Sequence, residues 1–548
     1  MKAFTNNIFI SLLLYYASLE VFATTEPCAL RTTKYGSVCV CNVTYCDYLE
    51  ENDILPIESD DFAIVSSSKA GLRFSYLKGN FHQESIVVED APKHIELEDS
   101  SKILKQQNSD AFIFDDAVIK INRNVSYQKI VGFGGSFTGA VSHNLDQLPE
   151  EIQNHVFRSY YSKNSGISYN MMRMPIGGCD FDLKPWAYNE NPVNDVNLTS
   201  FSQLDERDLY RLSQIQKLKE ISNNYDIKHM SSAWSPPPWM KSNNDWTGFS
   251  SLKKEFYQTW ADYHLRYLEL MEANNVKVWA ITTGNEPLNG VIGWMFVHFM
   301  SLGWTPKNQA IWVGENLGPT LKNSKFKDVK IFGNDDQRYT FPTWFKLMER
   351  THENSTSYLD GLAVHWYWDM FFPPNLIAKT HELYKDKIII NTESSVGDKP
   401  LETHGPELGS WDRGEKYANY YMEDLQNWVN GWIDWNLILN DHGGPNYVNN
   451  FVDSAVIYNN DNTEIYKQPI FYAIGHYSKF LPEGSIRIES SGNSRNIKNV
   501  AFLRPDGNIA VIILNKKNKL VKLKIVDELR GNIMISIPPR SVHTLIFK

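Results

Sequence analysis

The sequence has few features that would tie it to a membrane, to nucleic acid or to a metal. After residue 23, no apolar run approaches the roughly 20 residues that a membrane-spanning helix needs. The 54 basic residues are outnumbered by 64 acidic ones and form no basic block, so the net charge of −10 argues against a nucleic-acid partner. No histidine pair has the H-E-x-x-H spacing, and we expect no metal.

A nucleotide cofactor is also not expected. The glycine-rich stretch "GFGGSFTG" (132–139) carries Phe137 where the dinucleotide fingerprint needs glycine or alanine. We find no internal repeat and no low-complexity tract. These absences leave a globular protein with 42% hydrophobic residues, enough for a large core over 548 residues.

Cysteine is scarce, and its placement is informative. Four of the five cysteines cluster after residue 27, at Cys28, Cys39, Cys41 and Cys46. A dense, even cluster predicts disulfides, with a zinc site as the alternative. Cys179 is left over, and we expect it to be a free thiol.

Residues 1–23 are typical of a secretory signal peptide. Lys2 precedes the apolar stretch "IFISLLLYYA", and Val21 and Ala23 are spaced as small residues before a cleavage point. A membrane anchor is the alternative. N-x-[ST] sequons are candidate glycosylation sites in such a protein. They lie at Asn42, Asn124, Asn197 and Asn354.

From about residue 128, short apolar runs alternate with long amphipathic segments, which is the pattern of βα units. The candidate strands are 129–135, 167–174, 227–233, 276–283, 329–334, 361–367, 387–392 and 431–437. Helical periodicity is clearest in 203–222 and 251–273. Eight such units predict an α/β fold, the (β/α)₈ TIM barrel.

The regions flanking the barrel differ from it. Short alternating runs separated by turn residues predict a two-segment β-sandwich from 55–127 plus 485–548. We therefore divide the chain into a signal peptide (1–23), a small disulfide-bonded β region (24–54, joined by 437–468), this sandwich, and a catalytic barrel (128–484).

Two predicted strands lead into carboxylates. Glu286 follows the fourth strand and Glu393 ends the seventh, and in such a barrel both strand ends face one mouth. Paired carboxylates across a pocket are what glycoside hydrolysis requires. Taken singly, either glutamate could be a solvated or salt-bridged strand-end residue.

Aromatic residues are predicted at the same rim. They are Trp234, Trp239, Trp366, Tyr367 and Trp435. Sugars pack their C–H faces on such rings, while amides and carboxylates such as Asn285, Asp180 and Asn450 bind hydroxyls. The alternative is that the rings fill the core. His365 and Asp369 are expected to form a hydrogen-bonding shell rather than a metal site.

A string of motifs resembles glycoside hydrolase family 30 and, within it, the acid β-glucosidases (glucosylceramidases) of animals. The motifs include "CVCNVTYCD", "VGFGGSFTGA", "RMPIGGCDFD", "WSPPPWMK", "GNEP", "NDDQR", "AVHWYWD", "TESSVG", "GWIDWNLILNDHGGPN" and "YKQPIFYAIGHYSKFLPEGS". The resemblance covers almost all of the chain after the signal.

This resemblance implies a retaining hydrolase that removes glucose from glucosylceramide in the lysosome. By motif, Glu286 would be the general acid/base and Glu393 the nucleophile. Residues implied to hold glucose are Asp180, Trp234, Asn285 and Trp435. Residues implied to line the site or orient the pair are Arg173, His365, Tyr367 and Asn450.

The resemblance further implies disulfides Cys28–Cys39 and Cys41–Cys46, an activating saposin and a lysosomal transport receptor. The chain departs from the family pattern in three places. Gly284 replaces a long polar residue, Ser301 and Ser395 replace two cysteines, and the apolar loop 289–304 is longer. Another family 30 activity and a catalytically silent carbohydrate-binding protein remain alternatives.

Three physical expectations follow. The carboxyl groups of Glu286 and Glu393 should lie ~5 to 5.5 Å apart, and the charge of Glu393 should raise the pKa of Glu286. Full protonation of the 14 histidines would change the formal charge from −10 to +4, drawing the protein to anionic membranes in acid. The rim residues Trp294, Met295, Phe296 and Phe299 could then insert into lipid.

Overall fold

A computed structural model of the chain describes residues 26–55, 57–81, 86–88, 117–292, 297–399, 402–492 and 494–548. The predicted signal peptide lies outside the described residues, as do Trp294, Met295 and Phe296 of the 289–304 loop. Within the described part, no helix has the length and apolar character to span a bilayer.

Eight parallel strands close into a barrel, which confirms the predicted fold class. The strands are β7 (Gly132–Ser136), β8 (Met171–Pro175), β9 (Lys228–Ser232), β10 (Val278–Thr282), β11 (Lys330–Gln337), β12 (Gly361–His365), β13 (Ile388–Glu393) and β14 (Gly431–Asn436). They follow one another in chain order, and β14 pairs with β7 to close the ring. Each lies within a few residues of its predicted position.

An apolar layer crosses the barrel interior. Seven consecutive strands contribute one side chain each to a separate cluster. Its members are Met171, Met230, Ala280, Phe332, Ala363, Ile390 and Ile433. Such layers make the barrel a packed core, so polar chemistry is confined to the strand ends.

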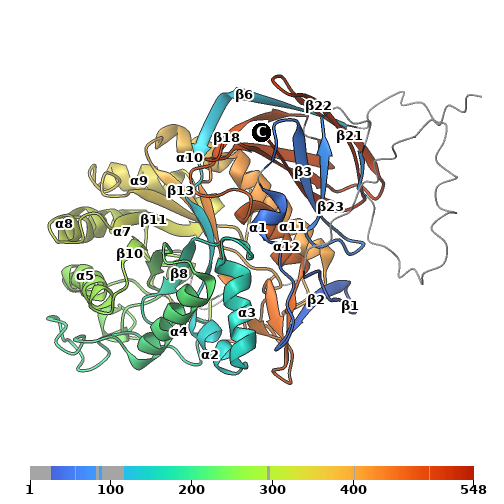
Figure 1. The fold of residues 1–548 in the computed structure, drawn as a ribbon. Helices are drawn as coiled ribbons and strands as arrows, with labels where there is room; N and C mark the ends of the chain where they lie inside the picture. The colour runs from blue at the N-terminus through green and yellow to red at the C-terminus, as the bar shows by residue number, and fades with distance from the viewer. Residues whose placement is uncertain are drawn as a thin grey trace, which may run out of the picture.

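Helices surround the barrel (Figure 1). In chain order they are α2 (Gly139–Asp146), α3 (Glu150–Tyr161), α4 (Glu206–Ser222), α5 (Tyr257–Ala273), α6 (Asn289–Ile292), α7 (Pro306–Trp312), α8 (Gly318–Lys322), α9 (Thr343–Thr351), α10 (Asn375–Leu383), α11 (Trp411–Gln426) and α12 (Pro469–Ser478). The Asp205 carboxylate caps α4, and the helix ends at the left-handed Asn223. A 3₁₀ turn, η3 (Lys254–Phe256), precedes α5, so this helix begins later than predicted.

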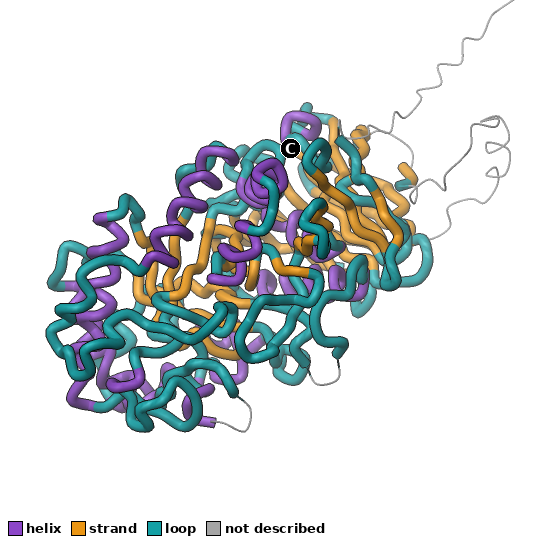
Figure 2. The backbone as a smooth tube through the Cα atoms, turned by 90° about the horizontal axis from the view of Figure 1, so that it is seen from below, coloured by secondary structure: helices purple, strands orange, loops and turns teal. Residues whose placement is uncertain are grey.

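The flanks of the barrel form a second body, visible beside it in Figures 1 and 2. Ten strands make one sheet in the order β4-β3-β23-β20-β19-β18-β6-β21-β22-β5. The first segment supplies β3 (Asp61–Ser68), β4 (Ser75–Asn80), β5 (Ile86–Val87) and β6 (Ala117–Lys129). The second supplies β18 (Ile486–Ser491), β19 (Ile497–Leu503), β20 (Ile509–Asn515), β21 (Val521–Asp527), β22 (Gly531–Ile537) and β23 (Ser541–Phe547).

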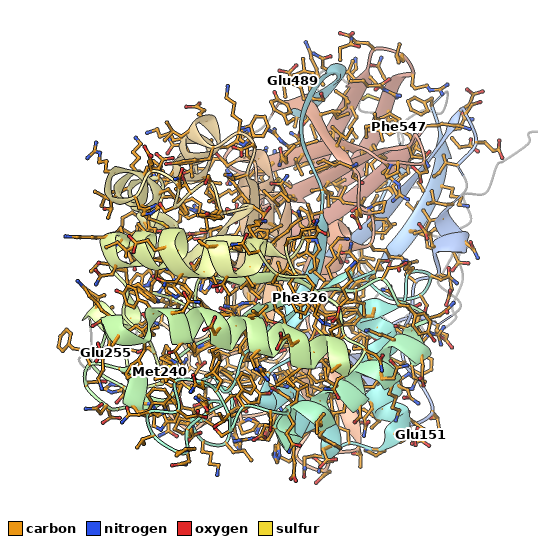
Figure 3. All side chains as sticks on the ribbon, turned by 90° about the vertical axis from the view of Figure 1, so that its left-hand side faces the viewer. Glu151, Met240, Glu255, Phe326, Glu489 and Phe547 are labelled. Atoms are coloured by element: carbon orange, nitrogen blue, oxygen red, sulfur yellow. A yellow bond between two sulfur atoms is a disulfide. The ribbon has the colours of Figure 1, made fainter. Side chains whose placement is uncertain are left out.

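Both segments are needed for the sandwich. β23 from the C-terminal segment pairs with β3, and β18 and β21 flank β6. A hydrophobic cluster that includes Ile64, Ile513 and Leu545 fills its interior. Figure 3 labels Phe547, at the end of β23, among the side chains of this body. The limits of the predicted domains themselves stay predictions.

The N-terminal region joins a third, five-stranded sheet. β1 (Leu30–Thr32) and β2 (Ser37–Asn42) lie beside β17 (Glu464–Lys467), β16 (Val456–Tyr458) and β15 (Leu439–Asn440). A short helix, α1 (Glu51–Ile54), follows. Disulfides join Cys28 to Cys39 and Cys41 to Cys46, as the resemblance implied, so the zinc alternative is wrong. Cys179 is a buried free thiol.

The four sequons differ in exposure. Asn124, Asn197 and Asn354 are exposed, whereas Asn42 is half-buried at the end of β2. Their occupancy stays a prediction.

Candidate active site

The two predicted glutamates meet at the carboxyl-terminal end of the barrel. Glu393 is the last residue of β13, and Glu286 follows β10 by four residues. One oxygen of each carboxylate and one ring nitrogen of His365 lie within 4.8 Å of one another. The nearest oxygens of the two carboxylates are therefore at most 4.8 Å apart. This distance is close to the ~5 to 5.5 Å between the carboxyl groups of retaining glycosidases and shorter than the ~6.5 to 9.5 Å of inverting ones.

The backbone holds Glu286 in an unusual conformation. Its φ is +43°, in the left-handed region that side-chain-bearing residues rarely adopt. The N–H of Glu286 donates to the carbonyl of Asp335 at 2.9 Å, and Asp335 itself has φ +60°. Such strain persists only where neighbours fix it, and it clusters at functional sites.

A chain of hydrogen bonds connects the two glutamates through three buried groups. His365 Nδ1 lies 3.1 Å from Glu286 Oε1, and its Nε2 lies 3.0 Å from Asp335 Oδ1. Arg173 Nη2 donates to Asp335 Oδ2 at 2.9 Å, and Arg173 Nη1 donates to Glu393 Oε2 at 2.5 Å. Each glutamate is thus bonded to one end of the sequence His365, Asp335, Arg173.

Three further donors fix the carboxylates. Gln337 Nε2 donates to Glu286 Oε1 at 2.7 Å, and Asn289 Nδ2 donates to Glu286 Oε2 at 2.5 Å. The Tyr367 hydroxyl donates to Glu393 Oε1 at 2.7 Å. Every oxygen of the pair therefore has a protein donor, which sets its orientation before substrate arrives.

Two tryptophans pack against each other beside the pair. The rings of Trp234 and Trp435 are stacked with centroids 5.5 Å apart, and Arg173 lies 4.8 Å from the Trp234 centroid. The N–H of Trp435 donates to the carbonyl of Ser394, next to Glu393. Trp239 and Trp366 pack in the main core, and Trp234 and Trp435 belong to a separate buried cluster next to Arg173.

Asp180 and Asn450 lie together at the same mouth. Asn450 Nδ2 donates to Asp180 Oδ2 at 3.3 Å. Burial, followed by the charge of Glu393, raises the pKa of Asp180 to about 8. Asn285, the remaining predicted residue, accepts from Arg173 Nη2 at 2.7 Å through Oδ1. The structure thus brings the two predicted glutamates and the eight residues that the resemblance assigned to the site to one end of the barrel, but not Trp239 and Trp366.

The predicted direction of the Glu286 pKa is wrong. Burial alone would raise it, but the hydrogen bond and charge of His365 outweigh burial and lower the pKa of Glu286. For Glu393, burial outweighs His365 and Arg173, so its pKa is raised. Burial lowers the pKa of His365, but Glu393 and Asp335 outweigh this effect and raise it to about 10. These directions place the proton of the pair on His365 and leave Glu286 ionised.

The sequence suggested that His365 and Asp369 form one hydrogen-bonding shell, and this prediction is wrong. The partners of His365 are Glu286 and Asp335, while Asp369 forms an ion pair with Arg338. In the described residues, Glu286, His365 and Glu393 also have the spacing of a metal site. Arg173 and a charged His365 already compensate these carboxylates, so the donor set does not fit a divalent cation.

Gly284 is the residue that the motif resemblance singled out as a departure before Asn285 and Glu286. Its φ is +115°, and a Cβ there would lie 3.7 Å from Ala233 O and 3.9 Å from Trp304 Nε1. Trp304 Nε1 is buried with no hydrogen-bond partner among the described residues. The missing side chain thus leaves space beside an unpaired donor, two residues from Glu286.

Sequence reasoning missed three residues of the site, Asp335, Gln337 and Asn289. Asp335 and Gln337 lie in β11, within the motif "NDDQR", and Asn289 begins α6 three residues after Glu286. The rule that found Glu286 and Glu393, a carboxylate at a strand end, applies equally to Asp335.

Comparison with known proteins agrees with this geometry. Residues 130–481 match the glycosyl hydrolase family 30 TIM-barrel domain, and residues 484–545 match the family 30 beta sandwich domain. The chain is 35% identical to lysosomal acid glucosylceramidase of Mus musculus, over 95% of this chain and 96% of that one. It is 24% identical to endo-1,6-beta-D-glucanase BGN16.3 of Trichoderma harzianum, over 76% and 84%.

Among solved structures, SrfJ from Salmonella typhimurium shares the fold. The TM-score is 0.75 with 24% sequence identity, covering 89% of this chain and 99% of that one. The match to both domain models and the identity with the mouse protein define the family. The chain is a glycosidase that belongs to glycoside hydrolase family 30.

Proposed function

We propose that the protein is a retaining β-glucosidase that hydrolyses glucosylceramide to glucose and ceramide in the lysosome. The observation that carries retention is the approach of the Glu286 and Glu393 oxygens to within 4.8 Å. The glucosylceramide substrate and the lysosomal location rest on 35% identity to the mouse enzyme over 95% of the chain.

In the first step, Glu393 attacks the anomeric carbon of glucose. The bond from this carbon to the ceramide oxygen breaks, and that oxygen takes a proton from Glu286. A glycosyl ester on Glu393 results. Arg173 and Tyr367 bind the two oxygens of Glu393 and so aim it while it is ionised.

The proton for this step comes from the His365–Glu286 pair. His365 carries it on Nδ1, 3.1 Å from Glu286 Oε1. Its transfer across this hydrogen bond gives a neutral imidazole and a protonated Glu286, with no change in the total charge of the site. Glu286 can therefore act as the acid although its pKa is lowered.

In the second step, Glu286 removes a proton from water, which attacks the anomeric carbon and releases Glu393. Two inversions give net retention. Trp234 and Trp435 offer the face on which glucose stacks, and Asp180 and Asn450 are placed to bind its hydroxyls.

Apolar side chains lie exposed on loops that follow three barrel strands. Phe249 follows β9, Val291 and Ile292 follow β10, and the loop after β12 exposes Trp368, Met370, Phe371 and Phe372. We assign these loops to contact with a lipid surface, which would bring the glucosyl headgroup to the mouth. The earlier candidate Phe299 is half-buried against the cluster of Trp234 and Trp435.

The predicted histidine-driven charge change is too large. Burial lowers the pKa of His229 to about 3, of His264 to about 4 and of His543 to about 3. Burial also places the pKa of His476 well below its usual value. These four of the 14 histidines therefore stay neutral in mild acid, so histidine protonation adds at most 10 positive charges instead of 14. Attraction to anionic membranes, a saposin-type activator and a transport receptor remain proposals.

A release assay tests the substrate. The protein should liberate glucose from glucosylceramide faster than galactose from galactosylceramide, and faster at pH 5 than at pH 7. Rapid cleavage of β-1,6-linked glucan with no release from glucosylceramide would instead assign the activity of the Trichoderma relative. No turnover of any β-glycoside would favour the silent carbohydrate-binding alternative.

A further inference from the structure

Asp335 is the central residue of the hydrogen-bond chain that connects the two glutamates. It contacts His365, which is bonded to Glu286, and Arg173, which is bonded to Glu393. Its side chain is fully buried. Oδ1 accepts from Thr392 Oγ1 at 2.6 Å and faces His365 Nε2 at 3.0 Å. Oδ2 accepts from Arg173 Nη2 at 2.9 Å and from Ser232 Oγ at 2.7 Å. With four partners, this carboxylate has no capacity left for substrate.

Burial would raise the pKa of Asp335, but Arg173 and His365 outweigh it and hold the pKa well below its usual range. Asp335 is therefore ionised throughout the working pH range. A buried carboxylate that stays charged and touches no substrate must act through its neighbours.

We propose that Asp335 is a positioning residue that fixes the proton of His365 opposite Glu286 and holds Arg173 on Glu393. The inference rests on the proposed two-step glucosidase function. Asp335 then orients the partners of both catalytic groups. Its Oδ1 orients His365, the partner of the acid/base Glu286, and its Oδ2 orients Arg173, the partner of the nucleophile Glu393.

The argument for the acid/base side concerns the histidine tautomer. When His365 Nε2–H donates to Asp335, only Nδ1 is left to exchange a proton with Glu286. An asparagine at 335 would place its NH₂ against either His365 or Arg173. Against His365, it would force Nε2 to accept, so the neutral ring would keep its hydrogen on Nδ1 and could not return Glu286 to the acid form.

The titratable groups of the His365–Glu286 pair and those that face it come from five strands or the segments that follow them. Arg173 lies on β8, Glu286 after β10, Asp336 on β11, His365 on β12 and Glu393 on β13. Removing the Asp335 charge leaves Arg173 in place and weakens the hold of His365 on its proton. The proton of the His365–Glu286 pair should then be lost at a lower pH.

The test compares Asp335→Asn with wild type on two aryl β-glucosides, one with an activated 2,4-dinitrophenyl leaving group and one with a poor phenolic leaving group. General acid catalysis matters little for the first and is worth about 10²-fold or more for the second. We expect the larger loss of kcat/KM on the poor leaving group, and a basic limb of the pH profile that moves to lower pH.

Asp434→Asn is the control for replacing a buried aspartate, although burial raises the pKa of Asp434 to about 7 while that of Asp335 is lowered. Asp434 is a buried aspartate of β14 that accepts from Tyr417 and Ser394 and touches neither His365 nor Arg173. The basic limb of the Asp434→Asn pH profile should stay at the wild-type pH.

If Asp335→Asn does not fold, Thr392→Val is the second test. It keeps the Asp335 carboxylate but removes a donor to Oδ1, so His365 should hold its proton more strongly and the basic limb should move to higher pH.

Equal losses on both substrates with an unmoved basic limb would overturn the inference and leave Asp335 a purely structural residue. An unmoved limb in Thr392→Val would overturn it as well. If wild type cleaves neither glucoside, the proposed function fails, and the inference fails with it.

Discussion

The barrel mouth and the sandwich core are equally buried but chemically opposite. Arg173, Asp335 and His365 at the mouth are as inaccessible as Ile513 and Leu545 in the sandwich. The sandwich fills its interior with apolar side chains that need no polar partners. The mouth instead buries charged side chains. The free-energy cost of removing these charges from water is offset only because each has a partner within hydrogen-bond distance.

This difference separates stability from function within one chain. Apolar burial stabilises the folded state, whereas a buried ion pair contributes little net stability and can cost some. The charged network at the mouth is therefore explained by the chemistry that it arranges. Changes in the two regions should have separable effects on folding and on catalysis.

The largest effect is expected at the mouth. Glu393→Gln keeps the shape of the side chain but removes the nucleophile, so turnover should fall by about 10⁴-fold or more, as for other essential nucleophiles. The variant should still bind glucosylceramide-containing vesicles and unfold near the wild-type temperature. Steady-state rates and a thermal melt check both points, and a rate near wild type would contradict the assignment.

The reverse outcome is expected in the sandwich. Ile513→Ala opens a cavity at a fully buried position of β20 and should lower the free energy of unfolding by ~2 to 5 kcal/mol. Because β20 contributes no residue to the site, kcat of the folded protein should not change. Urea unfolding and active-site-titrated rates test this separation. A large loss of kcat at full folding would show that the two regions are coupled.

A smaller, pH-dependent effect is expected from Tyr367→Phe. The Tyr367 hydroxyl donates to Glu393 and lowers its pKa, against the raising effect of burial. Its removal should raise the pKa of Glu393, so the nucleophile becomes protonated at a higher pH. The acidic limb of the kcat/KM profile should move upward, with a loss of about tenfold at the optimum. An acidic limb at the wild-type pH would mean that Glu393 does not set it.

The smallest effect is expected at the exposed rim. Phe371 has 64% of its surface exposed in the loop after β12. Phe371→Ser should weaken vesicle binding by roughly fivefold, about 1 kcal/mol of apolar contact, while cleavage of a water-soluble glucoside stays unchanged. Leu529→Ser is the control and should leave vesicle binding unchanged, because this exposed leucine lies between sandwich strands β21 and β22 and outside the loops that follow the barrel strands.

Strand periodicity made most of this architecture predictable. Several barrel strands, among them β10, β12 and β13, have an apolar run that leads into polar residues. Glu286, Glu393 and Trp435 were found because they lie at or shortly after the ends of predicted strands. The disulfide pairs and the individual roles came from motif resemblance, because four cysteines alone allow three pairings.

The electrostatics of the site could not be predicted from the sequence. The direction of the Glu286 pKa depends on His365, which lies 79 residues away in the chain and 3.1 Å away in space. Likewise, nothing in the spacing of Asp335 indicates that it meets Arg173, 162 residues earlier. The histidine charge count failed for a related reason, since burial in a folded core decides which histidines titrate.

The central claim is that Glu393 forms a covalent glycosyl ester with Glu286 as its acid/base partner. Incubation with 2-deoxy-2-fluoro-β-glucosyl fluoride should trap this ester, since the fluorine slows its hydrolysis. Mass spectrometry of the digested protein should then find one added fluoroglucosyl group, on the peptide that carries Glu393. A label on another residue, or release of α-glucose as the first product with no label, would contradict the account.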